Sequence, residues 1–260
     1  MLRELSLFSG IGGFSLGLER AGFATPVAFV EIDPFCQRVL AKHWLGVPIH
    51  GDVTTREFIE GEADVITGGF PCQDISLAGA GAGLAGARSG LYRHVIRAIR
   101  LVRPRYAILE NVAALLSRGL GTVLGDLAEV GYDAEWHCIP ASAVGAPHHR
   151  DRVWIISNRD KIGRNAQIGN LKSEDVVCNR RQWPSAPFSE WRNVEHWLKS
   201  PSADPIWENA PDTSCGVDDG VSSGLDSPEI GALGNAVVPQ VVEVIGRALS
   251  ARQALLRRAA

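Results

Sequence analysis

Short apolar runs that alternate with helix-like segments limit the folds open to this chain more than any other feature. The runs lie at residues 5–8, 26–30, 49–53, 63–67 and 106–109. Between them, segments such as residues 91–101 carry apolar residues at helical spacing. Strands that alternate with helices are typical of α/β proteins with a mainly parallel sheet. We therefore predict a Rossmann-like α/β fold.

The fourth run leads into Gly68-Gly69-Phe70-Pro71-Cys72-Gln73. Cys72 then lies just beyond the carboxyl end of a strand, where open α/β sheets bind their ligands. Pro71 fixes its own φ and restricts Phe70, and the Gly/Ala-rich loop at residues 78–90 has the composition of a mobile lid. A positioned thiol beside a lid indicates a nucleophile, although a small buried cysteine would also fit.

Acidic residues end several of the other runs. Glu110 follows the fifth run, on the edge of the sheet that also carries Cys72, so we treat the two as one site. Glu31 follows the second run, where this kind of fold binds ribose hydroxyls. Asp33 directly precedes Pro34 and is more simply a helix N-cap. Asp52 follows the third run; it either accepts a hydrogen bond from an adenine amino group or caps the next turn.

The first run breaks into Ser9-Gly10-Ile11-Gly12-Gly13 and then into helical spacing. A strand, a glycine turn and a helix allow a backbone to approach a nucleotide-like ligand and direct helix N–H groups at it. An ordinary tight turn would have the same sequence. The segment therefore predicts either a nucleoside-type cofactor site or a plain strand-to-helix connection.

Arg150 and Arg152 precede a strand at residues 153–156. Because they alternate, we expect them to share one face of an extended segment, either in the site or as solvated surface charges. A helix is expected after Pro239, and its apolar stripe must return to the main sheet. Residues 158–230 are polar, Pro- and Ser-rich and weakly periodic. We predict a large domain of residues 1–157 and 231–260 and a small irregular lobe of residues 158–230.

Composition limits the binding partners and the cellular compartment that fit this chain. The net charge of −3 gives no overall basic field, so any nucleic-acid surface must be local. Five cysteines at irregular spacing argue against a disulfide framework and fit a reducing compartment. We expect no membrane span, no signal peptide and no metal site, since Cys138 with His148 and His149 has no C-x-x-C pair beside it. These features predict a soluble cytoplasmic protein.

Taken in order, the motifs resemble those of the cytosine-5 DNA methyltransferases. They are FSGIGG from Phe8, EID from Glu31, GDV from Gly51, GFPCQ from Gly69, ENV from Glu110, HHRDR from His148 and GNAVVP from Gly234. The series resembles in particular the short single-chain bacterial or phage enzymes. His148 stands where the family usually has Gln, and no Arg-rich segment with a downstream Glu precedes Gly234.

The resemblance implies a catalytic group of Cys72 as nucleophile, Glu110 as acid, and Arg150 and Arg152 as ligands of the base, a phosphate or Glu110. It also implies the sheet of the S-adenosylmethionine-dependent methyltransferases with a target-recognition lobe. The residues that it implies for S-adenosylmethionine are Phe8, Gly10, Gly12, Gly13, Glu31, Ile32, Asp52, Asn235 and Val237. Asn111 would orient the site rather than react.

The implied substrate is a cytosine flipped out of double-stranded DNA and methylated at carbon 5. The alternative is a tRNA cytosine-5 methyltransferase of the same fold. A dinucleotide-dependent oxidoreductase would explain the glycine turn but not Cys72 with Glu110, and the intact PCQ and ENV argue against a non-catalytic DNA-binding relative. We expect a monomer, either solitary or paired with a cognate restriction endonuclease.

Overall fold

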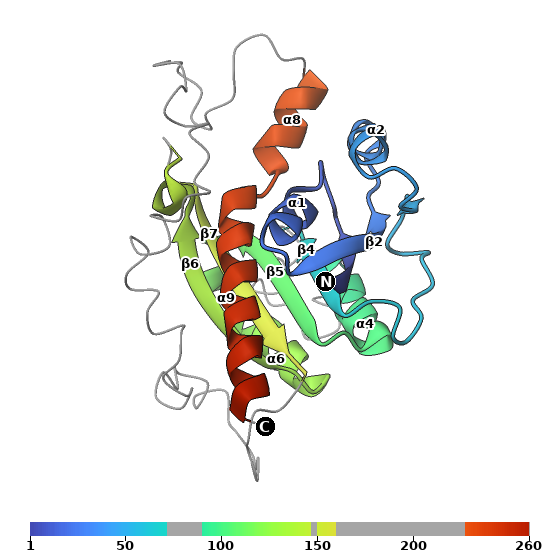
Figure 1. Cartoon of the computed structure of the whole chain (residues 1–260). Helices are drawn as coiled ribbons and strands as arrows, with labels where there is room; N and C mark the ends of the chain where they lie inside the picture. Colours follow the sequence, from blue (N-terminus) through green and yellow to red (C-terminus); the bar gives the residue numbers. More distant parts are fainter. Residues whose placement is uncertain (72–89, 147–149, 160–226, 260) are drawn as a thin grey trace.

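The computed structural model describes residues 1–71, 90–146, 150–159 and 227–259. Within these ranges, seven strands form one sheet in the order β3-β2-β1-β4-β5-β7-β6 (Figure 1). Strand β7 is antiparallel to β5 and β6, and the other pairs are parallel. The strands are β1 (Leu2–Leu7), β2 (Ala24–Val30), β3 (Ile49–His50), β4 (Val65–Gly69), β5 (Tyr106–Val112), β6 (Asp133–Pro140) and β7 (Asp151–Asn158). The predicted mainly parallel α/β sheet is confirmed.

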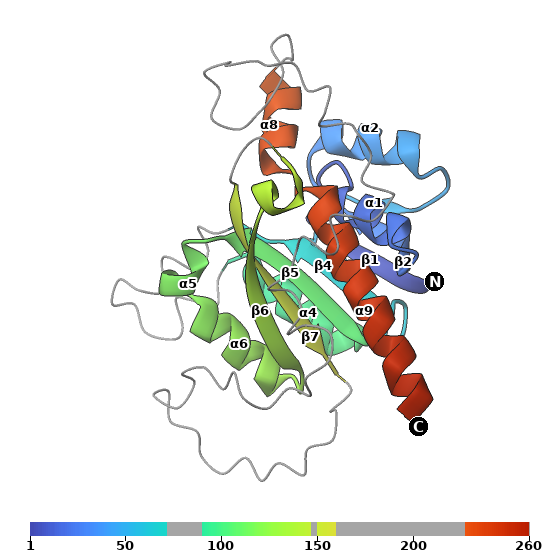
Figure 2. The ribbon, with the colours of Figure 1, turned by 60° about the vertical axis from the view of Figure 1, so that its left-hand side comes forward.

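Helices cover both faces of this sheet (Figures 1 and 2). One face is covered by α1 (Gly13–Arg20) and α9 (Pro239–Ala259), and the other by α4 (Tyr92–Val102), α5 (Leu115–Arg118) and α6 (Leu120–Glu129). The helices α2 (Pro34–His43) and α8 (Ser227–Asn235) contact each other near the carboxyl ends of the first strands. A 3-10 turn, η2 (Ala141–Val144), follows β6.

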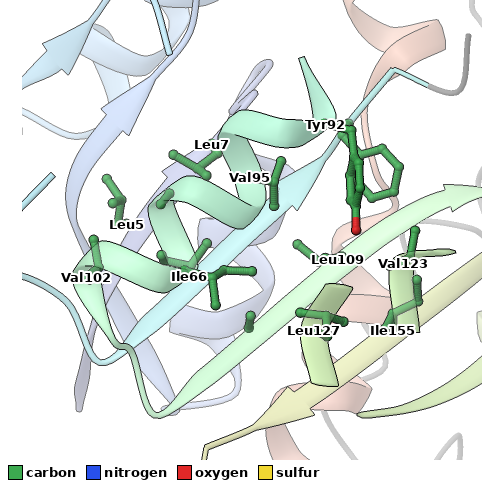
Figure 3. Close-up of a cluster of buried hydrophobic side chains, with 14 of the residues drawn as sticks. Leu5, Leu7, Ile66, Tyr92, Val95, Val102, Leu109, Val123, Leu127 and Ile155 are labelled. Atoms are coloured by element: carbon green, nitrogen blue, oxygen red, sulfur yellow. The ribbon is translucent and has the colours of Figure 1, made fainter. Parts of the chain in front are cut away.

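Alternation along the strands produces the core on the α4 side. Leu5 and Leu7 of β1 face α4 and are fully buried, so Ser6 between them and Glu4 before them face α1. Each fully buried leucine stabilises the fold by about 1.5–3 kcal/mol. The side chains labelled in this layer in Figure 3 are Leu5, Leu7, Ile66, Tyr92, Val95, Val102, Leu109, Val123, Leu127 and Ile155.

The C-terminal helix packs on the opposite face, as its apolar stripe predicts. Val242 and Ile245 of α9 are fully buried against α1 and the sheet. A Cβ at Gly17 of α1 would lie 2.5 Å from the Pro239 carbonyl oxygen, so only glycine allows the two helices to approach this closely. Pro239 is the first residue of α9, where its fixed φ suits a helix.

Several local predictions need revision. The strand predicted at residues 49–53 contains only Ile49 and His50, because Asp52 then forms a turn with Thr54. Helices α5 and α8 and the turn η2 were not predicted. The loop at residues 78–90 and most of the predicted lobe lie outside the described residues. None of the helices in the described ranges combines the length and the apolar character that crossing a bilayer requires.

Candidate active site

The glycine turn after β1 has an unusual backbone. Phe8, Gly10 and Gly12 all have positive φ, at 51°, 53° and 88°. Non-glycine residues rarely adopt this conformation, and such strain is found at functional sites. A Cβ at Gly10 would meet no atom within 4 Å, so open space lies beside the turn at this residue.

Gly12 and Gly13 must be glycines because other parts of the chain pack directly against them. A Cβ at Gly12 would lie 2.4 Å from the ring of Trp44, and one at Gly13 would lie 2.7 Å from the carbonyl oxygen of Val237. The two glycines therefore let Trp44 and Val237 close on the start of α1. A cofactor contact at Gly12 or Gly13 stays a prediction.

Trp44 is a residue that sequence reasoning missed. Its indole Nε1 donates to Glu19 Oε2 at 3.0 Å, and its ring packs on Phe29 at 5.3 Å. It therefore ties the end of α2 to α1 while bracing Gly12. A single tryptophan after a helix offers no sequence signal for a partner 32 residues away.

Glu31 lies at the tip of β2 and faces the glycine turn. Its Oε2 accepts from the Gly10 backbone N–H at 2.6 Å and its Oε1 from the Asp33 N–H at 2.8 Å. A carboxylate oxygen has a second acceptor position, so each can still bind a hydroxyl. The carboxylate is thus held by two backbone groups in an orientation that suits a ribose.

The residues after Glu31 follow the predictions made for them. Asp33 is the N-cap of α2, with Oδ1 accepting from Phe35 N at 2.7 Å and Cys36 N at 3.2 Å. Ile32 is 72 % exposed, which leaves a large apolar surface open beside the turn.

Asp52 and the C-terminal segment complete this region. Asp52 Oδ1 accepts from Thr54 N at 2.7 Å, which confirms the turn-capping alternative and holds the pKa of Asp52 below its usual value. The ionised carboxylate remains an acceptor for an amino group. Asn235, the last residue of α8, is exposed, and Val237 in the link to α9 packs on Gly13. The open turn, the held Glu31 and the exposed Ile32 together fit a nucleoside with its base and ribose.

Glu110 lies within β5, close to its carboxyl end, and is 8 % exposed. It pairs in register with Gly69 of β4, and a Cβ at Gly69 would lie 3.0 Å from Glu110 Oε2. Arg152 Nε lies 2.9 Å from Glu110 Oε1. Burial raises the pKa of the Glu110 carboxyl, although Arg152 and Arg150 partly oppose this. The site therefore holds a carboxyl that keeps a proton more readily than an exposed one.

Asn111 links Glu110 to the segment before Cys72. Its Nδ2 donates to the Phe70 carbonyl oxygen at 2.9 Å, and its Oδ1 accepts from the Val112 N–H at 2.9 Å. The Phe70 ring also packs on Tyr92 at 5.0 Å. The first described range ends at Pro71, so Cys72 lies outside the described residues. His148 also lies outside them.

The expectation that the two arginines share one face of a strand was wrong. Strand β7 begins at Asp151, and Arg150 before it has φ 41°, which breaks the alternation. Arg152 pairs with Glu110, whereas Arg150 Nη2 donates to the carbonyl oxygens of Gly234 at 2.7 Å and Ala236 at 2.8 Å. One arginine thus holds the acid and the other holds the segment that leads to α9.

Known proteins resemble this chain in sequence. The sequence profile described as C-5 cytosine-specific DNA methylase matches residues 2–200. Type II methyltransferase M2.BsuMI of Bacillus subtilis (strain 168) is 35% identical over 236 residues, which are 85% of this chain and 58% of that protein. Type II methyltransferase M.CviJI of Paramecium bursaria Chlorella virus IL3A is 38% identical over 197 residues, which are 74% of this chain and 49% of that protein. The chain thus spans about half the length of these relatives.

A solved structure shows the same fold. The Entamoeba histolytica methyltransferase EhMeth superposes with a TM-score of 0.60 over 96% of this chain and 98% of its own, at 13% identity. This family and fold imply S-adenosylmethionine as the cofactor. With the profile matched over most of its length and the predicted motifs in order along it, the chain belongs to the C-5 cytosine-specific DNA methylase family.

Proposed function

We propose that this protein transfers a methyl group to carbon 5 of a cytosine in duplex DNA at a specific sequence. One observation supports this most strongly. Glu110 is a buried carboxyl with a raised pKa, and it lies beside the strand that leads to Pro71 and Cys72. The chain also belongs to the C-5 cytosine-specific DNA methylase family. A reaction on a pyrimidine ring needs both a nucleophile and an acid of this kind.

Cys72 is the proposed nucleophile. Carbon 5 of cytosine attacks an electrophile poorly until a thiolate adds to carbon 6 and converts the ring to an enamine-like species. The new bond joins the Cys72 sulfur to carbon 6, and the displaced electrons move toward nitrogen 3. Carbon 5 then takes the methyl group, water acts as the base that removes the carbon 5 proton, and the bond between carbon 6 and the Cys72 sulfur breaks to release the thiolate.

Glu110 is the proposed acid at nitrogen 3. Because burial raises its pKa, Glu110 can donate a proton or a strong hydrogen bond as charge collects on the ring. Arg152 fixes the carboxyl through Oε1 and leaves Oε2 on the side of Gly69. Asn111 holds the carbonyl of Phe70, and so positions the chain that precedes Cys72.

S-adenosylmethionine, when bound, supplies the electrophilic methyl group. Phe8 and Gly10 would line its methionine and ribose portions, Glu31 would accept from its ribose hydroxyls, and Ile32 would cover one face of the adenine. Asp52 would accept from the adenine amino group. Asn235 and Val237 would border the methionine portion, with Gly12 and Gly13 shaping the turn behind it.

The DNA contacts would come mostly from parts outside the described residues. The loop at residues 73–90 is the proposed lid over the flipped cytosine, and residues 158–230 are proposed to recognise the flanking bases. Basic side chains there would make binding sensitive to salt. A cognate restriction endonuclease, where there is one, would share the target sequence.

The test measures transfer of labelled methyl groups from S-adenosylmethionine to duplex DNA and to tRNA. Wild-type protein should label DNA, and Cys72→Ala should lose this transfer while binding S-adenosylmethionine with nearly unchanged affinity. DNA with 5-fluorocytosine at the target should be trapped covalently, since fluorine replaces the proton that must leave. Labelling of tRNA alone would favour the tRNA alternative, and turnover by Cys72→Ala would refute the covalent route.

A further inference from the structure

Arg150 caps the end of α8. Its Nη2 donates to the carbonyl oxygens of Gly234 and Ala236 at 2.7 and 2.8 Å, and α8 ends at Asn235. The last carbonyls of a helix have no partners within the helix, and a cation there is favourable. One charged group just before β7 thus fixes a segment 84 to 86 residues further along the chain.

That segment shapes the proposed cofactor site from two sides. Val237, directly after Ala236, packs so closely on Gly13 that a Cβ there would lie 2.7 Å from the Val237 carbonyl oxygen. Helix α8 contacts α2, which begins just after Glu31 and Ile32, and Figures 1 and 2 show α8 beside α2. A shift of residues 234–237 would therefore change the position of the glycine turn and of the segment with Glu31 and Ile32, which is proposed to bind the ribose and adenine.

The backbone of Arg150 agrees with a positioning role. A non-glycine residue at φ 41° is strained, and such strain persists only where its surroundings hold it. Here the guanidinium bonds to two carbonyls supply that hold. Arg152, two residues later, has ordinary strand pairing with Val112 of β5 and directs its own guanidinium to Glu110.

We propose that Arg150 is a positioning residue for the cofactor, and not a ligand of the target base. It holds residues 234–237 against the glycine turn, so that the walls of the cofactor site are in place before the cofactor arrives. The inference rests on the proposed function in one respect, which is that S-adenosylmethionine is the ligand of this site. It assigns Arg150 to cofactor binding and Arg152 to the orientation of Glu110.

The experiment compares four variants of the full chain. Arg150→Gln removes the cation, Arg150→Lys keeps it, and Arg152→Gln removes the neighbouring arginine. Arg100→Gln is the matched control, because Arg100 is exposed on α4. The Kd for S-adenosylmethionine is measured by calorimetry without DNA, and amide hydrogen exchange is followed over residues 231–242.

Arg150→Gln should weaken S-adenosylmethionine binding by about 10- to 100-fold, since two charged hydrogen bonds are lost. Exchange at residues 231–242 should accelerate, and the KM for S-adenosylmethionine should rise more than the KM for DNA. Arg150→Lys should recover part of the affinity. Arg152→Gln and Arg100→Gln should both bind the cofactor within about twofold of wild type, a change too small to count as a lost interaction.

Two failures are distinguishable. Wild-type protein that does not bind S-adenosylmethionine would refute the proposed function itself. Wild-type protein that binds it, with Arg150→Gln binding equally well and showing unchanged exchange, would refute only the role of Arg150. A rise in the KM for DNA alone would also overturn it, because that result would make Arg150 a ligand of the substrate. Unfolding curves separate loss of fold from loss of binding, and Arg150→Lys tests the role again in a variant that keeps the charge.

Discussion

Glu110 and Glu4 are both buried in this sheet, and only Glu110 lies where a substrate can reach it. Glu110, near the carboxyl end of β5, is 8 % exposed and pairs with Arg152. Glu4, in the middle of β1 under α1, is 0 % exposed and accepts from the Thr67 hydroxyl at 2.6 Å. Burial raises the pKa of both, to about 7 for Glu4. A raised pKa alone therefore does not mark a catalytic acid.

A third glutamate shows that an arginine partner is not sufficient either. Oε1 of Glu135 in β6 lies 3.4 Å from Nη1 of Arg252 in α9, and burial raises the pKa of Glu135 to about 7. It lies in the first half of its strand, away from the edge that carries Glu110. What distinguishes Glu110 is its place near a strand end, in register with the strand that leads to Cys72.

Replacement of each acid by its amide gives the largest contrast. Glu110→Gln should lower methyl transfer to DNA by about a thousandfold, since general acid catalysis contributes between about 100- and 10,000-fold. Glu4→Gln should keep the rate within about threefold, because Glu4 touches no proposed substrate position; that is below the loss expected of any acid catalyst. The measurement is kcat at saturating substrates, with thermal unfolding as the control. Equal losses in the two variants would break the comparison.

The sequence predicted Glu110 but not Glu4, for a physical reason. The position of Glu110 follows from a local pattern, an apolar run with an acid after it, and parallel strands bring such ends to one edge. The N-cap role of Asp33 was equally local, because Pro34 follows it. Glu4 meets Thr67 across 63 residues, and a single acid in a strand does not show which face of the sheet it will occupy.

The same limit applies to the arginines and glycines of the site. Arg150 and Arg152 stand two residues apart, yet their partners come from residues 234–236 and from Glu110. Gly12 is needed because Trp44 packs on it, a contact that no spacing rule reveals. Sequence therefore predicted that Glu31 and Glu110 lie at the carboxyl ends of their strands, while the partners of the site residues depend on how distant segments pack.

The pH dependence of stability should sharpen the comparison next. The pKa of Glu4 is about 7 in the folded protein, against an ordinary 4.5, so the folded state holds the proton more tightly than the unfolded chain. Between about pH 4.5 and pH 7 the unfolded state binds fewer protons, so the Glu4 carboxyl lowers stability as pH rises. The difference corresponds to roughly 3 kcal/mol.

Glu4→Gln removes this dependence. Relative to wild type, the variant should gain stability from pH 4.5 to pH 8, measured as the free energy of unfolding in urea at each pH. Glu135 titrates in a similar range in both proteins, so taking the difference removes its contribution. A constant difference across the range would show that Glu4 is not protonated in the folded state.

Arg152→Gln should shift the pH profile of activity by a smaller amount. Arg152 lowers the pKa of Glu110, so its loss should raise that pKa further. The proton on Glu110 would then be kept to higher pH, and the basic limb of the pH profile of kcat/KM should move to higher pH. The maximal rate should fall, by less than in Glu110→Gln. A basic limb that stays in place would assign that limb to another group.

The smallest expected effect concerns the hydrogen bond that stabilises the buried Glu4 carboxyl. Thr67 donates to Glu4 at 2.6 Å inside the core, and both side chains are fully buried. Thr67→Val keeps the shape and removes the donor, so it should destabilise the fold by about 1 kcal/mol, the usual value of such a bond. Thr67→Ser, which keeps the hydroxyl, is the matched control and should lose only the small packing contribution of a methyl group. Urea unfolding at pH 5 measures both. If valine were tolerated as well as serine, the Thr67 hydroxyl would contribute nothing to holding Glu4, whereas Glu110 is held by a charged partner.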